Sequence, residues 1–179
     1  NTFSTLQNDF KVKIDDIRKR IDVDVKRMNG VTEATAKEAV SIFVQIPSPY
    51  IGQIECAVNT ETVEIHSLKC GSIELDVKTS HVTLDDVSGT VEINCNLDME
   101  VLCNSLNGEV DINQISATSR IHIPENSVFT AVTKGIGTNI FYEKNGQQTD
   151  RFDTSDSENI IELNGIKSEL VIYTGKERG

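Results

Sequence analysis

Six side chains with carboxylate or amide oxygens recur at matching positions of three neighbouring segments. In each segment a carboxylate is followed two residues later by a second oxygen-bearing side chain. The six residues are Glu74, Asp76, Glu92, Asn94, Asp111 and Asn113. Such oxygens suit Ca²⁺ as ligands, and they also hydrogen-bond to sugar hydroxyl groups. If the segments are adjacent strands, the six residues form an acidic stripe beside a row of amides, which is a candidate binding face.

The same stripe is also typical of a solvated sheet face whose charges resist association. Calcium-binding solenoids of the nonapeptide type repeat glycine and aspartate in their turns, and nothing like G-G-x-G-x-D occurs here. We therefore favour the solvated face over a calcium site and expect neither a metal nor another cofactor. The six residues remain the candidate binding face.

Other polar residues do not form a known catalytic pattern. Asp85 and Asp86 are consecutive, so within one strand their side chains point to opposite sides of the sheet. His66 and His122 alternate with apolar residues, which predicts that they point outward. The sequence contains no H-E-x-x-H, phosphate-binding loop or G-x-S-x-G. We expect a protein without catalytic activity.

The residues that would position these side chains belong to a repeat of about nineteen residues. Each unit contains two short stretches with apolar and polar residues in alternation, such as Val63 to Ile65 and Ile73 to Val77. Gly71, Gly89 and Gly108 separate the stretches, which predicts bends there. We expect an all-β fold, a β-solenoid of two-strand coils stacked into two parallel sheets, with irregular capping strands at both ends.

The repeat also divides the chain of 179 residues, which we expect to form a single domain. The expected parts are N-terminal capping strands over 1–39, regular coils over 40–143, a polar insertion over 144–158 and a terminal coil over 159–175. The coils would begin with a strand over Val40 to Ile46.

Composition excludes some partners. The net charge of −11 is unsuited to nucleic acid, which needs a basic face. No stretch is long and apolar enough for a membrane span, and no targeting segment is visible. The basic residues before Met28 alternate with acidic ones, which favours a charged edge strand over attachment to an acidic surface.

Four cysteines occur, at spacings that fit no zinc site. The repeat places Cys56, Cys95 and Cys103 at inward positions, which indicates small buried side chains. Cys70 falls in a predicted turn and is expected to be exposed. A disulfide between Cys95 and Cys103 is the alternative to two buried thiols.

Two nine-residue segments resemble the V-S-G-x-V-x-I units of a bacterial family of adhesin-like domains. They are Asp85-Asp86-Val87-Ser88-Gly89-Thr90-Val91-Glu92-Ile93 and Asn104-Ser105-Leu106-Asn107-Gly108-Glu109-Val110-Asp111-Ile112. The stretch Val44-Gln45-Ile46-Pro47 is also similar to that family. The resemblance implies a β-solenoid in the cell envelope or outside the cytoplasm. It implies no functional residues.

Together these observations favour a non-catalytic, extracytoplasmic binding or adhesin-like domain of a bacterium. Its expected partners are a carbohydrate or a protein at the cell surface. One alternative is a polymerising scaffold similar to the bactofilins, joined through coil edges. The other is a carbohydrate-active β-helix enzyme.

Overall fold

The computed structural model describes residues 10–17, 20–28, 30, 32, 41–46, 52–144, 146–150 and 157–174. The chain forms two compact units, residues 1–45 and 46–179. Most of the Val31–Ala39 segment and the aspartates Asp153 and Asp156 lie outside the described residues. The expectation of one domain with a cap over 1–39 stays a prediction.

The first unit contains an antiparallel pair of strands. Strand β1 (Phe10–Ile17) pairs with β2 (Arg20–Arg27), from Phe10 opposite Arg27 to Ile17 opposite Arg20. Both strands lie in the part of the chain where capping strands were expected.

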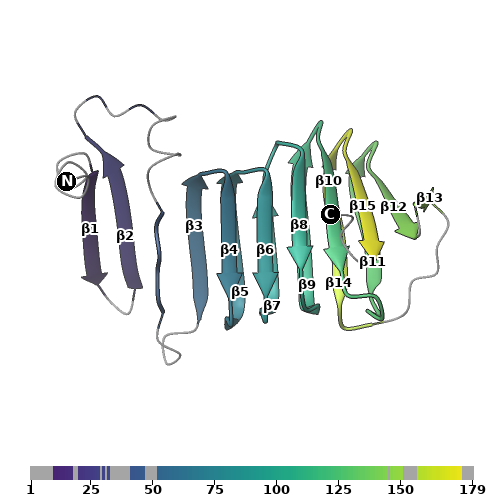
Figure 1. Ribbon diagram of the computed structural model, residues 1–179, viewed down its shortest axis with the longest axis horizontal. Helices are drawn as coiled ribbons and strands as arrows, with labels where there is room; N and C mark the ends of the chain where they lie inside the picture. The colour runs from purple at the N-terminus through teal and green to yellow at the C-terminus, as the bar shows by residue number, and fades with distance from the viewer. Residues whose placement is uncertain are drawn as a thin grey trace. The chain divides into compact units, whose positions relative to one another are not determined.

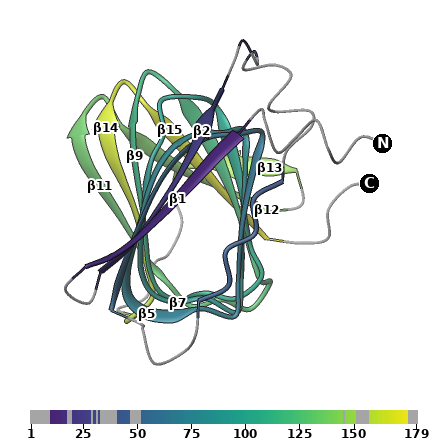
Figure 2. The ribbon, with the colours of Figure 1, turned by 90° about the vertical axis from the view of Figure 1, so that its left-hand side faces the viewer.

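The second unit is a β-solenoid made of two parallel sheets that face each other (Figures 1 and 2). Sheet I contains β3 (Gln53–Asn59), β5 (Lys69–Lys78), β7 (Ser88–Asn94), β9 (Asn107–Ile115), β11 (Thr130–Ile136) and β14 (Ile160–Ile166). Sheet II contains β4 (Thr62–His66), β6 (His81–Asp85), β8 (Met99–Cys103), β10 (Thr118–Ile123), β12 (Asn139–Lys144), β13 (Gln147–Thr149) and β15 (Glu169–Thr174). The chain passes from one sheet to the other at nearly every turn, so each coil contributes one strand to each sheet. The predicted fold class is confirmed.

The strand register follows the nineteen-residue spacing of the sequence. Val63 lies opposite Val82 in sheet II, and Val82 lies opposite Val101. Inward side chains from both sheets fill the space between them, and Ile93 and Ile112 are 0% exposed. Because alternate side chains of a strand point to opposite faces, this register places the intervening polar residues on the outside.

The coils are not stacked in the order of the sequence. In sheet I, β14 lies between β9 and β11, and in sheet II, β15 lies between β10 and β12. The terminal coil expected over 159–175 is therefore enclosed, and β11, β12 and β13 form the end of the stack. The inward residues of the enclosed coil are aliphatic, and Leu163 and Ile172 are 0% exposed, whereas much of β11 is exposed. Placing the most apolar coil inside buries more apolar surface.

The strand expected over residues 40–46 is wrong for the described part. Residues 41–46 belong to no strand, and Phe43 is 94% exposed. The first solenoid strand is β3, which begins at Gln53. The alternation of Ile42, Val44 and Ile46 is a strand pattern, but Pro47 and Pro49 follow, and proline has no N–H to donate to a ladder. Apolar alternation is insufficient here without backbone partners.

All four cysteines are free, so Cys95 and Cys103 are two buried thiols and not a disulfide. The expectation that Cys70 is exposed in a turn is wrong. Cys70 lies within β5, is half-buried and packs against the core. The register of β5 against β7 shifts between Lys69 and Ser72, and this irregularity lets Cys70 contact the core.

We expect all four thiols to react slowly in the native protein and rapidly once it is unfolded. Burial raises the pKa of Cys56 and Cys70, and raises that of Cys103 to about 11. Since the thiolate is the reactive form, these shifts reduce reactivity at neutral pH. Absorbance with a thiol-specific disulfide reagent, with and without urea, measures this. One thiol reacting at the unfolded rate would contradict the placement of Cys70.

Candidate functional site

The outer face of sheet I carries two rows of polar side chains that run across successive strands. The acidic row contains Glu55, Glu74, Glu92, Asp111 and Glu162, each opposite the next in the strand register. The amide row contains Asp76, Asn94, Asn113 and Asn164, paired in the same way. All six residues of the candidate binding face lie in these rows, so their predicted alignment is confirmed. That they bind a ligand stays a prediction.

Hydrogen bonds connect the amide row from coil to coil. Nδ2 of Asn94 donates to Oδ1 of Asp76 at 2.8 Å, and Nδ2 of Asn113 donates to Oδ1 of Asn94 at 2.8 Å. Nδ2 of Asn113 also donates to Oε1 of Glu92 at 2.8 Å. These bonds fix the side chains in place, so the row presents a pre-organised set of oxygen and nitrogen atoms.

Electrostatic repulsion accumulates along the acidic row, because neighbouring parallel strands lie only about 4.8 Å apart. Burial raises the pKa of Glu74, and the charges of Asp76, Glu92 and Glu55 raise it further. The row therefore favours any positive charge that approaches it.

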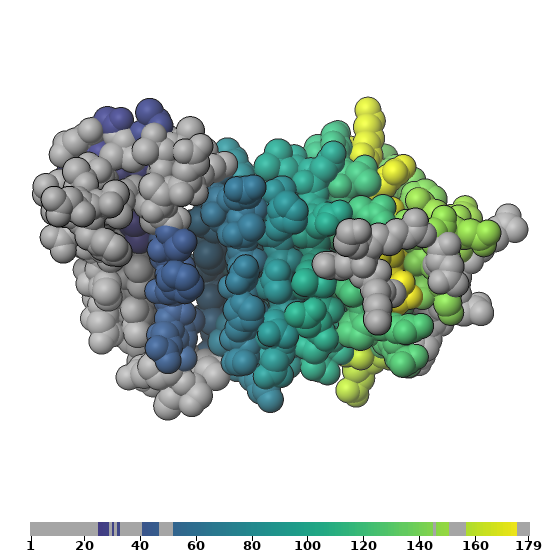
Figure 3. All heavy atoms as spheres, viewed as in Figure 1, coloured from purple at the N-terminus to yellow at the C-terminus, as the bar shows by residue number. Residues whose placement is uncertain are grey.

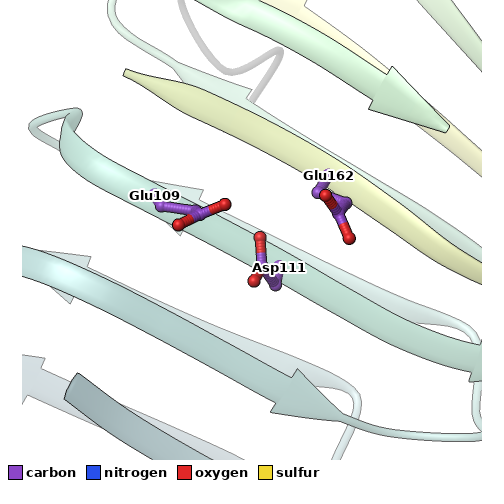
Figure 4. Close-up of side chains that lie close together, drawn as sticks. All are labelled: Glu109, Asp111 and Glu162. Atoms are coloured by element: carbon purple, nitrogen blue, oxygen red, sulfur yellow. The ribbon is translucent and has the colours of Figure 1, made fainter. Parts of the chain in front are cut away.

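The acidic row is densest at β9 and β14, where three carboxylates meet (Figure 4). Ligand oxygens of Glu109, Asp111 and Glu162 all lie within 4.8 Å of one another. Oδ1 of Asp111 is buried, and none of the described residues donates a hydrogen bond to it. Nζ of Lys134, on β11, lies 2.7 Å from Oε2 of Glu162. The three carboxylates have a geometry that could hold a cation, and Lys134 already supplies one positive charge.

We expect the protein to lose stability as the pH rises from about 4 to about 7, through Asp111. Burial, then the neighbouring charges of Glu109 and Glu162, raises the pKa of Asp111 from 3.8 to about 7. The folded state therefore binds the proton of Asp111 more tightly than the unfolded state does. The stabilisation that this gives is complete below pH 4 and lost above pH 7.

Replacement of Asp111 by Asn removes this ionisation while keeping the shape of the side chain. Because Asp111 is only half-buried, we expect Asp111→Asn to stabilise the protein at pH 8 by about 1 kcal/mol, and much less at pH 4. Urea unfolding at both pH values measures the difference. Glu100→Gln on the outside of sheet II is the matched control. A gain for Asp111→Asn that is equal at both pH values would refute the assignment.

Three members of this cluster were missed from the sequence. Glu162 follows the polar insertion, so the nineteen-residue spacing no longer predicts that it lies beside Asp111. Lys134 is missed for the same reason, because β14 separates its strand from β9. Glu109 is the third residue of β9 and follows Gly108, where a bend was predicted. Glu55, by contrast, lies nineteen residues before Glu74, so the spacing was sufficient to find it.

The consecutive carboxylates Asp85 and Asp86 do not both lie within β6, so strand alternation does not set the directions of their side chains. Asp86 occupies the bend after β6, with φ of 52°, whereas Asp85 ends the strand. Oδ2 of Asp85 lies 3.3 Å from Nδ1 of His66, and Oε2 of Glu64 lies 3.2 Å from Nε2. Glu64 first, and then Asp85, raises the pKa of His66 by hydrogen bonding. This exposed network links β4 to β6, and its spacing of nineteen residues was visible in the sequence.

A hollow lined by Leu84, Val91, Cys103 and Val110 is about the size of one water molecule, too small for an organic ligand. The outer side chains of β4, β6 and β8 form adjacent bands in Figure 3.

Among the described residues there is no helix with the length and apolarity to cross a bilayer. No family model matches the chain, and no curated protein or solved structure is significantly similar to it.

Proposed function

We propose that this chain is a non-catalytic binding domain that acts outside the cytoplasm of a bacterium, in the manner of an adhesin. The observation that supports this is the outer face of sheet I, where the acidic row crosses five strands in register and the amide row crosses four. Repeating polar rows at strand spacing suit a partner with its own regular repeat of hydroxyl or cationic groups. A cell-surface carbohydrate or protein has that character.

The proposed location is supported by the resemblance of the Asp85–Ile93 and Asn104–Ile112 segments to adhesin-like domains. The polymerising scaffold and the carbohydrate-active enzyme are the alternative functions. The three functions differ in their effect on a glycan. A scaffold does not bind it, an enzyme cleaves it, and a binding domain binds it without changing it.

Binding of the labelled protein to purified bacterial surface polysaccharides and to intact bacterial cells tests this function. The double variant Glu74→Gln with Glu92→Gln removes two charges from the acidic row and keeps the side-chain size. We expect at least tenfold weaker binding for it. Glu100→Gln with Glu169→Gln, on sheet II, is the matched control and should bind normally.

Equal binding by the two double variants would contradict a role for sheet I. Release of new reducing ends from a polysaccharide would support the enzyme instead. Binding to no surface component, together with concentration-dependent filaments, would support the scaffold.

A further inference from the structure

Strand β11 is the last strand of sheet I, and none of the described residues pairs with its outer edge. The two sheets differ at this end of the solenoid. In sheet II, β13 folds back antiparallel on β12, from Tyr142 opposite Thr149 to Lys144 opposite Gln147, and so covers the second half of that edge. An uncovered edge strand offers unpaired N–H and C=O groups to another strand. The open edge of β11 is therefore a place for association.

The backbone of β11 divides its hydrogen-bonding groups between two sides. The N–H of Thr130 donates to the carbonyl oxygen of Asn159, and the carbonyl oxygen of Ile136 accepts from the N–H of Lys167. Since successive residues of a strand direct these groups to alternate sides, the even-numbered residues face β14. Ala131 and Thr133 direct theirs to the open edge, whereas Gly135, with φ of 99°, departs from the extended conformation near the end of the strand.

The charge pattern of sheet I changes at β11. Glu162 is the last residue of the acidic row, and Val132 of β11 lies opposite it. Asn164 is the last residue of the amide row, and Lys134 of β11 lies opposite it. Lys134 forms an ion pair with Glu162 at 2.7 Å. The chain as a whole carries a net charge of −11, which opposes self-association. The outer face of β11 has no acidic side chain, so this repulsion is weakest there.

Large apolar side chains are exposed at both ends of β11. Ile136, at its end, is 75% exposed, and Val128, just before its start, is 56% exposed. The two side chains therefore flank the strand at its opposite ends. Exposed aliphatic side chains beside an open strand edge are typical of an interface.

We propose that β11 pairs with β11 of a second copy of this chain, antiparallel and around a twofold axis at Thr133. Thr133 then lies opposite Thr133 of the second copy, and Ala131 lies opposite Gly135. The same residues of the two copies meet each other, as an isologous contact requires. Sheet I becomes one sheet that continues through both copies.

The side chains agree with this register. Val132 lies opposite Lys134 of the second copy, so no like charges are directly opposed. Ile136 lies opposite Thr130 of the second copy and diagonal to its Val128, which covers both exposed aliphatic residues. Ala131 has a small side chain and Gly135 has none, which allows the two backbones to approach. This proposal does not depend on the binding function of the acidic and amide rows.

Sedimentation equilibrium of the full chain over a wide concentration range tests the dimer. We expect a species of twice the monomer mass. For Ile136→Lys we expect the dissociation constant of the dimer to be at least tenfold higher. Ile115→Lys is the matched control, because Ile115 is 53% exposed in the same outer row but lies on β9. A monomer at every concentration would overturn the proposal, as would equal effects of the two substitutions.

Cross-linking of Thr133→Cys identifies the symmetry. In an antiparallel hydrogen-bonded pair the two Cα atoms lie about 5.5 Å apart, within reach of a disulfide. We expect oxidation to give a covalent dimer in high yield, whereas Ile115→Cys gives none. Species larger than the dimer would indicate head-to-tail assembly instead. If the chain stays monomeric and binds added extended peptides, the edge of β11 has a different partner. Either result refutes the twofold pairing.

Discussion

Replacing Ile93 by Ala is expected to destabilise the solenoid by about 2–5 kcal/mol, the range for a buried aliphatic side chain that leaves a cavity. Ile93 is 0% exposed on β7, and it lies between Leu75 of β5 and Ile112 of β9 in the strand register. These neighbours belong to other coils and are held by their own ladders. They cannot collapse into the space that the substitution creates, so the loss should fall in the upper part of that range.

The matched control is Glu92→Ala, one residue earlier on the same strand. Glu92 faces outward, accepts one hydrogen bond from Asn113 and lies between two other carboxylates of the acidic row. Loss of the bond and relief of the repulsion oppose each other, so we expect a change within about 0.5 kcal/mol. Urea unfolding followed by far-UV circular dichroism gives both free energies. Similar losses for the two variants would mean that the inward and outward faces are assigned wrongly.

The register of the solenoid could be predicted from the sequence because two independent periods agree. Alternation within Val82-Thr83-Leu84 identifies which side chains point inward, and the nineteen-residue spacing identifies which strands are neighbours. A shift of one residue would expose every apolar side chain of a strand, so only one register buries them all. The same reasoning placed Glu74, Glu92 and Asp111 in one row.

The order of the last coils could not be predicted in this way. The insertion over 144–158 interrupts the spacing, so the sequence pattern no longer indicates which coil follows which. Both β11 and β14 have a strand pattern that suits the edge of β9. What decides between them is the amount of apolar surface each buries, which depends on all neighbouring strands at once. The acidic cluster of Asp111 and Glu162 follows from this order, and it was therefore missed too.

The bends between strands were predicted at the wrong residues, for a related reason. Glycine was expected at each bend, but Ser67, Asp86, Ser116 and Lys167 adopt the left-handed conformation there, with φ between 51° and 53°. Gly89 and Gly108 instead lie near the starts of β7 and β9. They are required for close contact between coils and not for the change of direction.

Replacing Gly89 by Ala is expected to destabilise the protein by at least about 3 kcal/mol, because two penalties add. Gly89 has φ of +116°, a backbone conformation that disfavours a side chain. A Cβ atom at this position would also overlap the carbonyl oxygen of Cys70 in the preceding coil. Since that oxygen belongs to the backbone of β5, it cannot move aside without displacing the strand.

Gly52→Ala is the matched control, because a Cβ atom there meets nothing within 4 Å and φ lies outside the left-handed region. We expect that substitution to change stability by no more than about 0.5 kcal/mol. The comparison needs only the unfolding free energies of the two variants in urea. If Gly89→Ala were as stable as Gly52→Ala, the coils could not be stacked as closely as the structure shows at β5 and β7. A large loss at Gly89 alone would establish that the backbone contact between neighbouring coils sets their spacing, and with it the spacing of the acidic and amide rows on the outer face.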